Sequence, residues 1–69
     1  MTQKELLYLE DAINHEKNII SICNEAINML ENDDLISFFE NEKNKHQELF
    51  DSLINSMEVM VNEWSINYE

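Results

Sequence analysis

Apolar residues in the first half of the chain recur at alternating spacings of three and four residues. The series is Leu6, Leu9, Ile13, Glu16, Ile20, Cys23, Ile27 and Leu30, in which Glu16 is the one polar member. This heptad pattern predicts a helix that buries one stripe of its surface. Thr2 followed three residues later by Glu5 is typical of a capping box. We therefore expect a helix from about residue 2 to residue 30.

A polar stretch then separates this helix from a second seam. Residues 31–34 read Glu-Asn-Asp-Asp, and Asp33 or Asp34 is suited to cap a new helix. The second seam is Leu35, Phe39, Glu42, His46, Leu49, Leu53, Ser56 and Met60. It predicts a helix from about residue 34 to residue 64. Residues 1–69 thus form one all-α domain, an antiparallel two-helix hairpin with a turn at about 31–34.

Each predicted helix carries a second apolar flank beside its seam. The flanking residues are Ala12, Ile19 and Ala26 in the first helix, and Phe38, Phe50, Ile54, Met57, Val61 and Trp64 in the second. A hairpin alone buries only one stripe of each helix, so these flanks need another partner. We expect a homodimer, in which two hairpins form a four-helix bundle of the ferritin-like kind. Met57, Met60, Trp64 and Tyr68 would then serve as core or dimer contacts.

The composition excludes several functions. The 69 residues include 15 acidic side chains, four lysines, no glycine and no proline, and the net charge is −11. Without glycine the chain cannot form a phosphate-binding loop, and scattered lysines do not suit a nucleic-acid backbone. No apolar run reaches the roughly 20 residues of a membrane span, and no signal peptide is visible. We expect a cytoplasmic protein, with no nucleic-acid or membrane partner, whose single Cys23 is a reduced core thiol.

The polar members of the two seams are the candidate functional residues. A hairpin folded about Asn32 places Glu16 near His46, and Glu42 lies one turn from His46 on the same face. Two interpretations stay open. The residues form a hydrogen-bonded layer that fixes the register of the bundle, or Glu16, Glu42 and His46 of two chains bind iron, zinc or manganese. His15 is turned by about 100° from Glu16 and is expected at the bundle edge.

Residues 9–16 (LEDAINHE), Asp34-Leu35 and Lys45-His46-Gln47 resemble the short ferritin-like spore coat proteins of clostridia and bacilli, which are related to rubrerythrin. The resemblance covers about residues 4–53. It implies that Glu16 corresponds to the first-helix glutamate of a di-iron centre. The second-helix Glu-x-x-His motif is absent, because His46 and Leu49 stand where its Glu and His would be. The resemblance therefore implies a scaffold with a lost or altered metal site, associated with spores.

Three functions follow from these observations. The first is a non-enzymatic, homo-oligomeric scaffold or assembly protein of the spore-coat type, and the second is a metal-binding mini-ferritin. The third is an acidic regulatory hairpin that binds a protein partner, as small sporulation phosphatases are also two-helix hairpins. Their Ser-Gln-Glu-Leu-Asp box is matched here by residues 46–50, His-Gln-Glu-Leu-Phe, which lack both ends of the box. No catalytic constellation stands out, which favours a non-enzymatic role without deciding the question.

Overall fold

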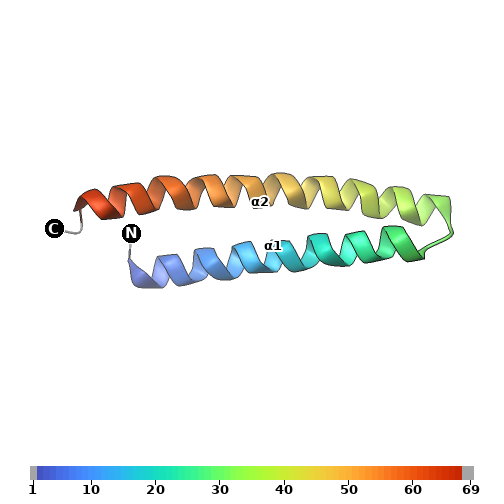
Figure 1. The fold of residues 1–69 in the computed structure, drawn as a ribbon, viewed down its shortest axis with the longest axis horizontal. Helices are drawn as coiled ribbons and strands as arrows, with labels where there is room; N and C mark the ends of the chain where they lie inside the picture. The colour runs from blue at the N-terminus through green and yellow to red at the C-terminus, as the bar shows by residue number, and fades with distance from the viewer. Residues whose placement is uncertain (1, 68–69) are drawn as a thin grey trace.

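The protein is an antiparallel pair of long helices. The computed structural model describes residues 2–67, with side chains for residues 2–63. Helix α1 spans Gln3–Met29 and helix α2 spans Asp33–Asn67 (Figure 1). The Cα atoms extend over 56 × 16 × 12 Å, so the hairpin is long, with two broad faces. The predicted all-helical hairpin is confirmed for the described residues, whereas Tyr68 and the side chain of Trp64 lie outside them.

Helix α1 begins at the predicted capping box. The Glu5 amide donates to Thr2 Oγ1 over 3.1 Å, and the Thr2 amide donates to Glu5 Oε1 over 2.9 Å. These two bonds satisfy backbone donors that have no partner inside the helix. At the other end Leu30 leaves the helical conformation, with φ −82° and ψ 149°. The helix therefore ends at Met29, one residue before the predicted end.

Helix α2 begins with a different cap from the predicted one. Asn32 Oδ1 accepts a hydrogen bond from the Leu35 amide over 3.0 Å, so Asn32 is the capping residue. The expectation that Asp33 or Asp34 caps the helix is wrong. Both aspartates lie instead in the first turn, where their charges interact favourably with the positive end of the helix dipole. The helix continues to Asn67, three residues past the predicted end.

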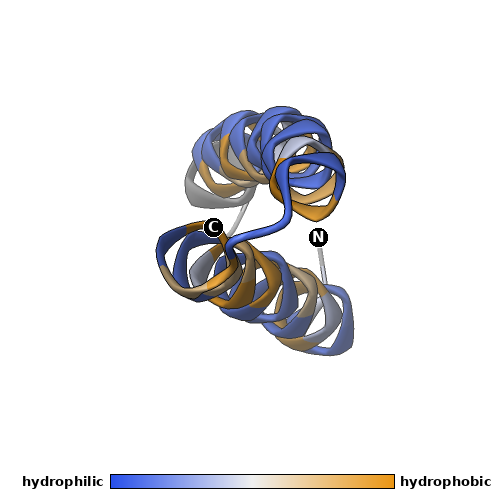
Figure 2. Cartoon of the chain, turned by 90° about the vertical axis from the view of Figure 1, so that its right-hand side faces the viewer, coloured by the Kyte–Doolittle hydropathy of each residue, from blue (hydrophilic) through white to orange (hydrophobic). Residues whose placement is uncertain are grey.

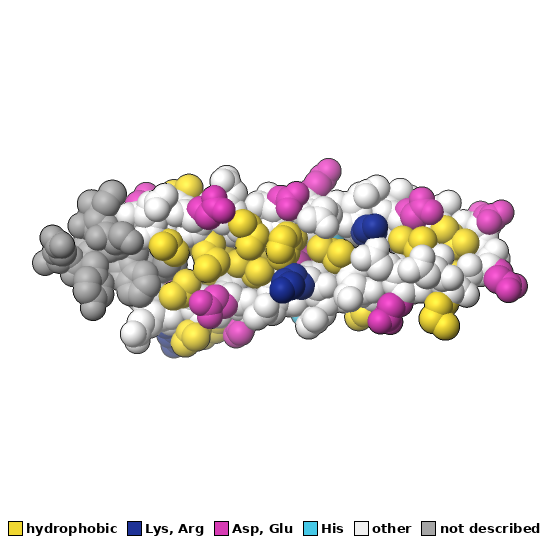
Figure 3. Space-filling view, viewed as in Figure 1, with side chains coloured by type: hydrophobic (Ala, Val, Ile, Leu, Met, Phe, Trp, Pro, Cys, Tyr) yellow, Lys and Arg dark blue, Asp and Glu magenta, His cyan; other side chains and the backbone are white. Residues whose placement is uncertain are grey.

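The contact between the helices is thin. Among the side chains that the structure places, the only buried hydrophobic ones are Ile13, 8% exposed, and Cys23, 3% exposed. Other members of the α1 seam are half-buried. Figure 2 shows hydrophobic positions on the sides of the helices that face each other, and Figure 3 shows hydrophobic side chains along the line between them. One hairpin therefore leaves most of its apolar surface in contact with solvent.

The predicted seam of α2 is partly wrong. Phe39, His46 and Leu53 lie at the contact with α1, as expected. Four other predicted members are exposed: Leu35, Leu49, Ser56 and Met60. Their places are taken by the next residue along the chain in three cases, so that Ile36, Phe50 and Met57 are half-buried. Adjacent apolar residues allow both alignments, and the helix rotates so that the bulky Phe50 faces α1.

Candidate functional site

A polar pair lies inside the hairpin at mid-length. Glu16 is the central residue of α1, and it faces His46 of α2. His46 Nδ1 lies 2.5 Å from Glu16 Oε2, and the two side chains are 19% and 13% exposed respectively. The predicted contact between a carboxylate and an imidazole is therefore present. Because the two residues are 30 positions apart in the sequence, this hydrogen bond joins the two helices at one level.

Glu42 extends this pair toward the surface. His46 Nε2 lies 3.6 Å from Glu42 Oε2, one helical turn away, and Glu42 is 30% exposed. The Lys45 ammonium lies 3.5 Å from Glu42 Oε1 and is largely in solvent. Glu16, His46, Glu42 and Lys45 thus form a polar layer that runs from the interior to the edge of the hairpin. We refer to these four residues as the polar layer.

The chemistry of the polar layer is that of a structural hydrogen-bond network. Each nitrogen of the His46 ring faces a carboxylate, so the ring is held on both edges. In the described part of the chain, no buried side-chain nitrogen or oxygen lacks a partner. A satisfied polar layer costs little, whereas removing one member leaves the other buried and unpaired. The layer therefore suits the alignment of two helices in one register.

The same residues were predicted to bind a metal ion. Residues 2–67 contain no group of three or more His, Cys, Asp or Glu side chains arranged to hold one ion. Glu16 and Glu42 approach different nitrogens of His46, so the two carboxylates lie at different edges of the ring. Metal binding by Glu16, Glu42 and His46 across two chains stays a prediction. His15, expected at the edge, is exposed.

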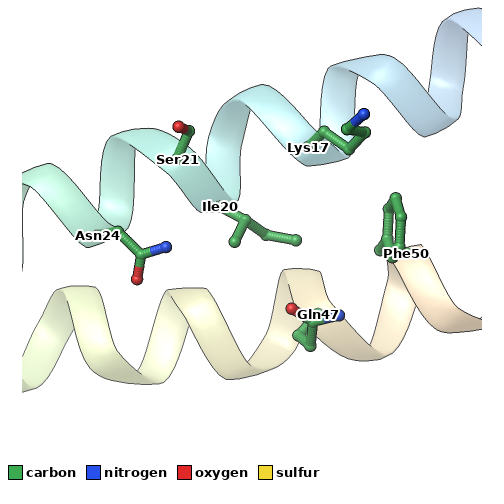
Figure 4. Close-up of a pocket in the computed structure, with 6 residues that line it drawn as sticks. All are labelled: Lys17, Ile20, Ser21, Asn24, Gln47 and Phe50. Atoms are coloured by element: carbon green, nitrogen blue, oxygen red, sulfur yellow. The ribbon is translucent and has the colours of Figure 1, made fainter.

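A second surface feature is an open groove between the helices. Ile20 and Phe50 point into the space between α1 and α2, and Lys17, Asn24 and Gln47 lie around them (Figure 4). The groove is lined by one cation, two amides and the Ser21 hydroxyl, with no histidine or carboxylate among its lining residues. It offers no base to activate the hydroxyl, so it gives no support to an enzymatic function.

The sequence interpretation missed the most extensive feature, which is exposed apolar surface on both helices. Among the side chains of residues 2–63, the large exposed hydrophobics are Leu7, Tyr8, Ile22, Met29, Leu35, Phe38, Leu49, Val59 and Met60. Phe38 was predicted to flank the seam, but Tyr8, Ile22 and Met29 were not singled out. The signal was present as a strict interval of seven residues through positions 8, 15, 22 and 29. Contiguous exposed apolar surface of this kind marks interaction sites.

Comparisons with known proteins add no relative to this picture. No protein-family model matches the chain, and no curated protein or solved structure matches it. Neither described helix is long and apolar enough to cross a membrane. The case for a function therefore rests on the polar layer and on the exposed apolar side chains.

Proposed function

We propose that this protein is a non-enzymatic scaffold or assembly protein that works as a homo-oligomer, with two hairpins pairing into a four-helix bundle. The observation that carries the proposal is the imbalance of burial. In the described residues, two hydrophobic side chains are buried and nine large ones are exposed. A chain of 69 residues has little room for a core of its own, and a second chain supplies the missing cover.

The energetic scale supports association. Fully burying one large apolar side chain contributes about 1.5 to 3 kcal/mol. Covering even half of the exposed set would contribute on the order of 10 kcal/mol before the cost of association. A small domain is stable by only about 5 to 15 kcal/mol. The second chain therefore has enough effect to decide whether the hairpin is folded.

The ferritin-like spore-coat assignment belongs to this proposal. It is supported by the resemblance of residues 9–16 and 45–47, and the helical hairpin agrees with half of a four-helix bundle. In such a scaffold the polar layer aligns the helices. Lys43, three residues before His46, replaces the glutamate that a second-helix metal motif would need. Association with the spore follows as part of the same proposal.

A metal-binding role is the second candidate, because the structure does bring Glu16, Glu42 and His46 into contact. Pairing of two chains would supply two copies of this set. Carboxylate and imidazole ligands suit zinc, iron and manganese. The titration that separates this role from the scaffold role is described in the Discussion.

Light scattering after size exclusion tests the proposed function. At micromolar concentration we expect a helical species of about 16 kDa, twice the chain mass of 8.2 kDa. Circular dichroism on the same fraction checks that the species is folded. A folded species of 8.2 kDa would contradict the proposal, because a stable monomer has no need of a shared core.

A further inference from the structure

The exposed hydrophobic residues stand at a fixed position relative to the seam. Each of four immediately precedes a seam residue: Tyr8 before Leu9, Ile22 before Cys23, Met29 before Leu30, and Phe38 before Phe39. One residue corresponds to a turn of about 100°, in the same sense on both helices. Because the helices are antiparallel and face each other, all four side chains emerge on the same broad face.

The remaining exposed residues of α2 extend this set along the helix. Leu49 follows Phe38 by 11 residues, and Met60 follows Leu49 by 11, which is close to three full turns. Leu35 and Val59 stand 14 residues before Leu49 and 21 residues after Phe38, again close to whole turns. We call the resulting surface the apolar face; its members are Tyr8, Ile22, Met29, Leu35, Phe38, Leu49, Val59 and Met60.

The opposite broad face is different. Positions that follow a seam residue are mostly polar: Glu10, Lys17, Asn24, Glu40 and Gln47. Three of these residues line the groove of Figure 4, which is therefore on this polar side. Leu7, the one large exposed hydrophobic outside the apolar face, lies on the outer side of α1. Only one broad face of the hairpin is therefore built to be covered.

The apolar face has one polar interruption. His15 and Lys45 precede Glu16 and His46, and Glu42 lies beside Lys45 at 3.5 Å. Since Glu16 is the central residue of α1, this interruption lies at mid-length of the hairpin. A twofold axis through this level brings the interruption of one copy against that of the other. Each Lys45 then faces the Glu42 of the second copy.

We infer that a second copy of this chain covers the apolar face in an antiparallel, twofold arrangement, with reciprocal Lys45–Glu42 pairs at the axis. The inference rests on the proposed self-association and assigns its surface and direction. The area is sufficient, because a broad face of 56 by 16 Å covers about 900 Å². A stable interface of ordinary size needs about 800 Å² on each partner.

Charge decides the direction. The turn carries Glu31, Asp33 and Asp34, and the last turn of α1 has no basic residue. A parallel pair of hairpins would place two such turns side by side, within about one Debye length of 8 to 10 Å. The antiparallel pair puts them at opposite ends of a molecule 56 Å long, where salt screens them from each other.

A pair of matched variants tests the surface. Ile22 and Leu7 are both 59% exposed and both lie on α1, but only Ile22 belongs to the apolar face. Ile22→Glu should weaken dimerisation by at least about 100-fold in sedimentation equilibrium, because it buries a charge in apolar packing. Leu7→Glu should change it by less than about threefold. A dimer that tolerates both changes equally would overturn the inference and leave the proposed function standing.

Distances between spin labels test the direction without disturbing the fold. In a Cys23→Ala background, cysteine is introduced at exposed Met29 or His15 and labelled. Met29 lies 13 residues from the centre of α1, so the antiparallel dimer predicts roughly 40 Å between its two labels. The labels at His15 should be within about 20 Å of each other. A distance below about 20 Å between labels at Met29 would show a parallel pair and overturn the inference.

Discussion

His46 and Glu16 meet at mid-length of the hairpin, where His46 Nδ1 approaches Glu16 Oε2 to 2.5 Å. This is the one side-chain hydrogen bond between the two helices among the described residues. Apolar seams slide more easily than hydrogen bonds, because a shifted seam still buries apolar area. The pair therefore specifies which level of α1 lies against which level of α2.

Breaking this pair on one side should destabilise the protein. We expect Glu16→Leu to cost about 1 to 3 kcal/mol, because His46 is left half-buried without its main partner. The double variant Glu16→Leu with His46→Leu should recover much of the loss, since neither polar group remains. Urea unfolding of the wild type, the two single variants and the double variant measures the coupling. Glu10→Leu, at an exposed position on the same helix, is the control. Additive losses in the double variant would contradict a shared layer.

Lys45 gives a prediction about charge at the dimer axis. Within one chain its contact with Glu42 is a surface pair worth about 0 to 1 kcal/mol. Between two copies the reciprocal pairs add to this. Lys45→Glu should therefore weaken dimerisation more than tenfold, with the effect reduced by added salt. Lys17→Glu makes the same charge change on the polar side and should alter it far less. Equal effects in sedimentation would mean that only net charge matters.

Metal binding is tested by the response to divalent cations. If Glu16, Glu42 and His46 hold an ion, micromolar Zn(II), Fe(II) or Mn(II) should raise the melting temperature, and saturation at 100 times Kd adds about 2.7 kcal/mol. Screening of the net charge of −11 would instead require millimolar Mg(II) or Ca(II) and would not distinguish the ions. His46→Ala should keep the screening effect and lose the micromolar one. An identical response of the wild type and His46→Ala to every ion would rule out the metal role.

The capping box predicts a local dependence on pH. Hydrogen bonds from the backbone and side chain of Thr2 lower the pKa of the Glu5 carboxyl below its ordinary value of 4.5. The stabilisation of the first turn is therefore complete above pH 4.5 and is lost as the pH falls through the lowered pKa. Carboxyl chemical shifts should report this titration, together with the amide shift of Thr2. Thr2→Ala should move the midpoint of Glu5 upward, and an unchanged midpoint would contradict the role of the cap.

The extent to which the sequence predicted this structure differs between elements. The α1 seam and the Thr2–Glu5 cap were predicted correctly, because single apolar residues at regular spacing leave only one alignment. In α2, neighbouring apolar residues such as Leu35 and Ile36, or Leu49 and Phe50, permit two alignments that share Phe39, His46 and Leu53. Contacts with α1 choose between them. The cap of α2 was ambiguous for a similar reason, since Asn32, Asp33 and Asp34 are all good capping residues.

The candidate site followed the same division. The contact of Glu16 with His46 was predicted, since both residues belong to alignments that the structure keeps. The apolar face was missed on α1, because its residues at positions 8, 22 and 29 recur only every seven residues and flank a stronger pattern. Their significance depends on the direction of α2, which places Phe38 and Leu49 on the same side.

The central claim is that a second copy completes the fold, and the dependence of thermal unfolding on protein concentration tests it most directly. When folding and dimerisation are coupled, each tenfold rise in concentration adds about 1.4 kcal/mol to the apparent stability. For two chains of 69 residues this corresponds to a rise in melting temperature of roughly 3 to 8 °C per tenfold step. We predict such a rise from 1 to 100 micromolar, on the order of 10 °C in total. A melting temperature that stays constant over this range would show that a single hairpin is stable by itself.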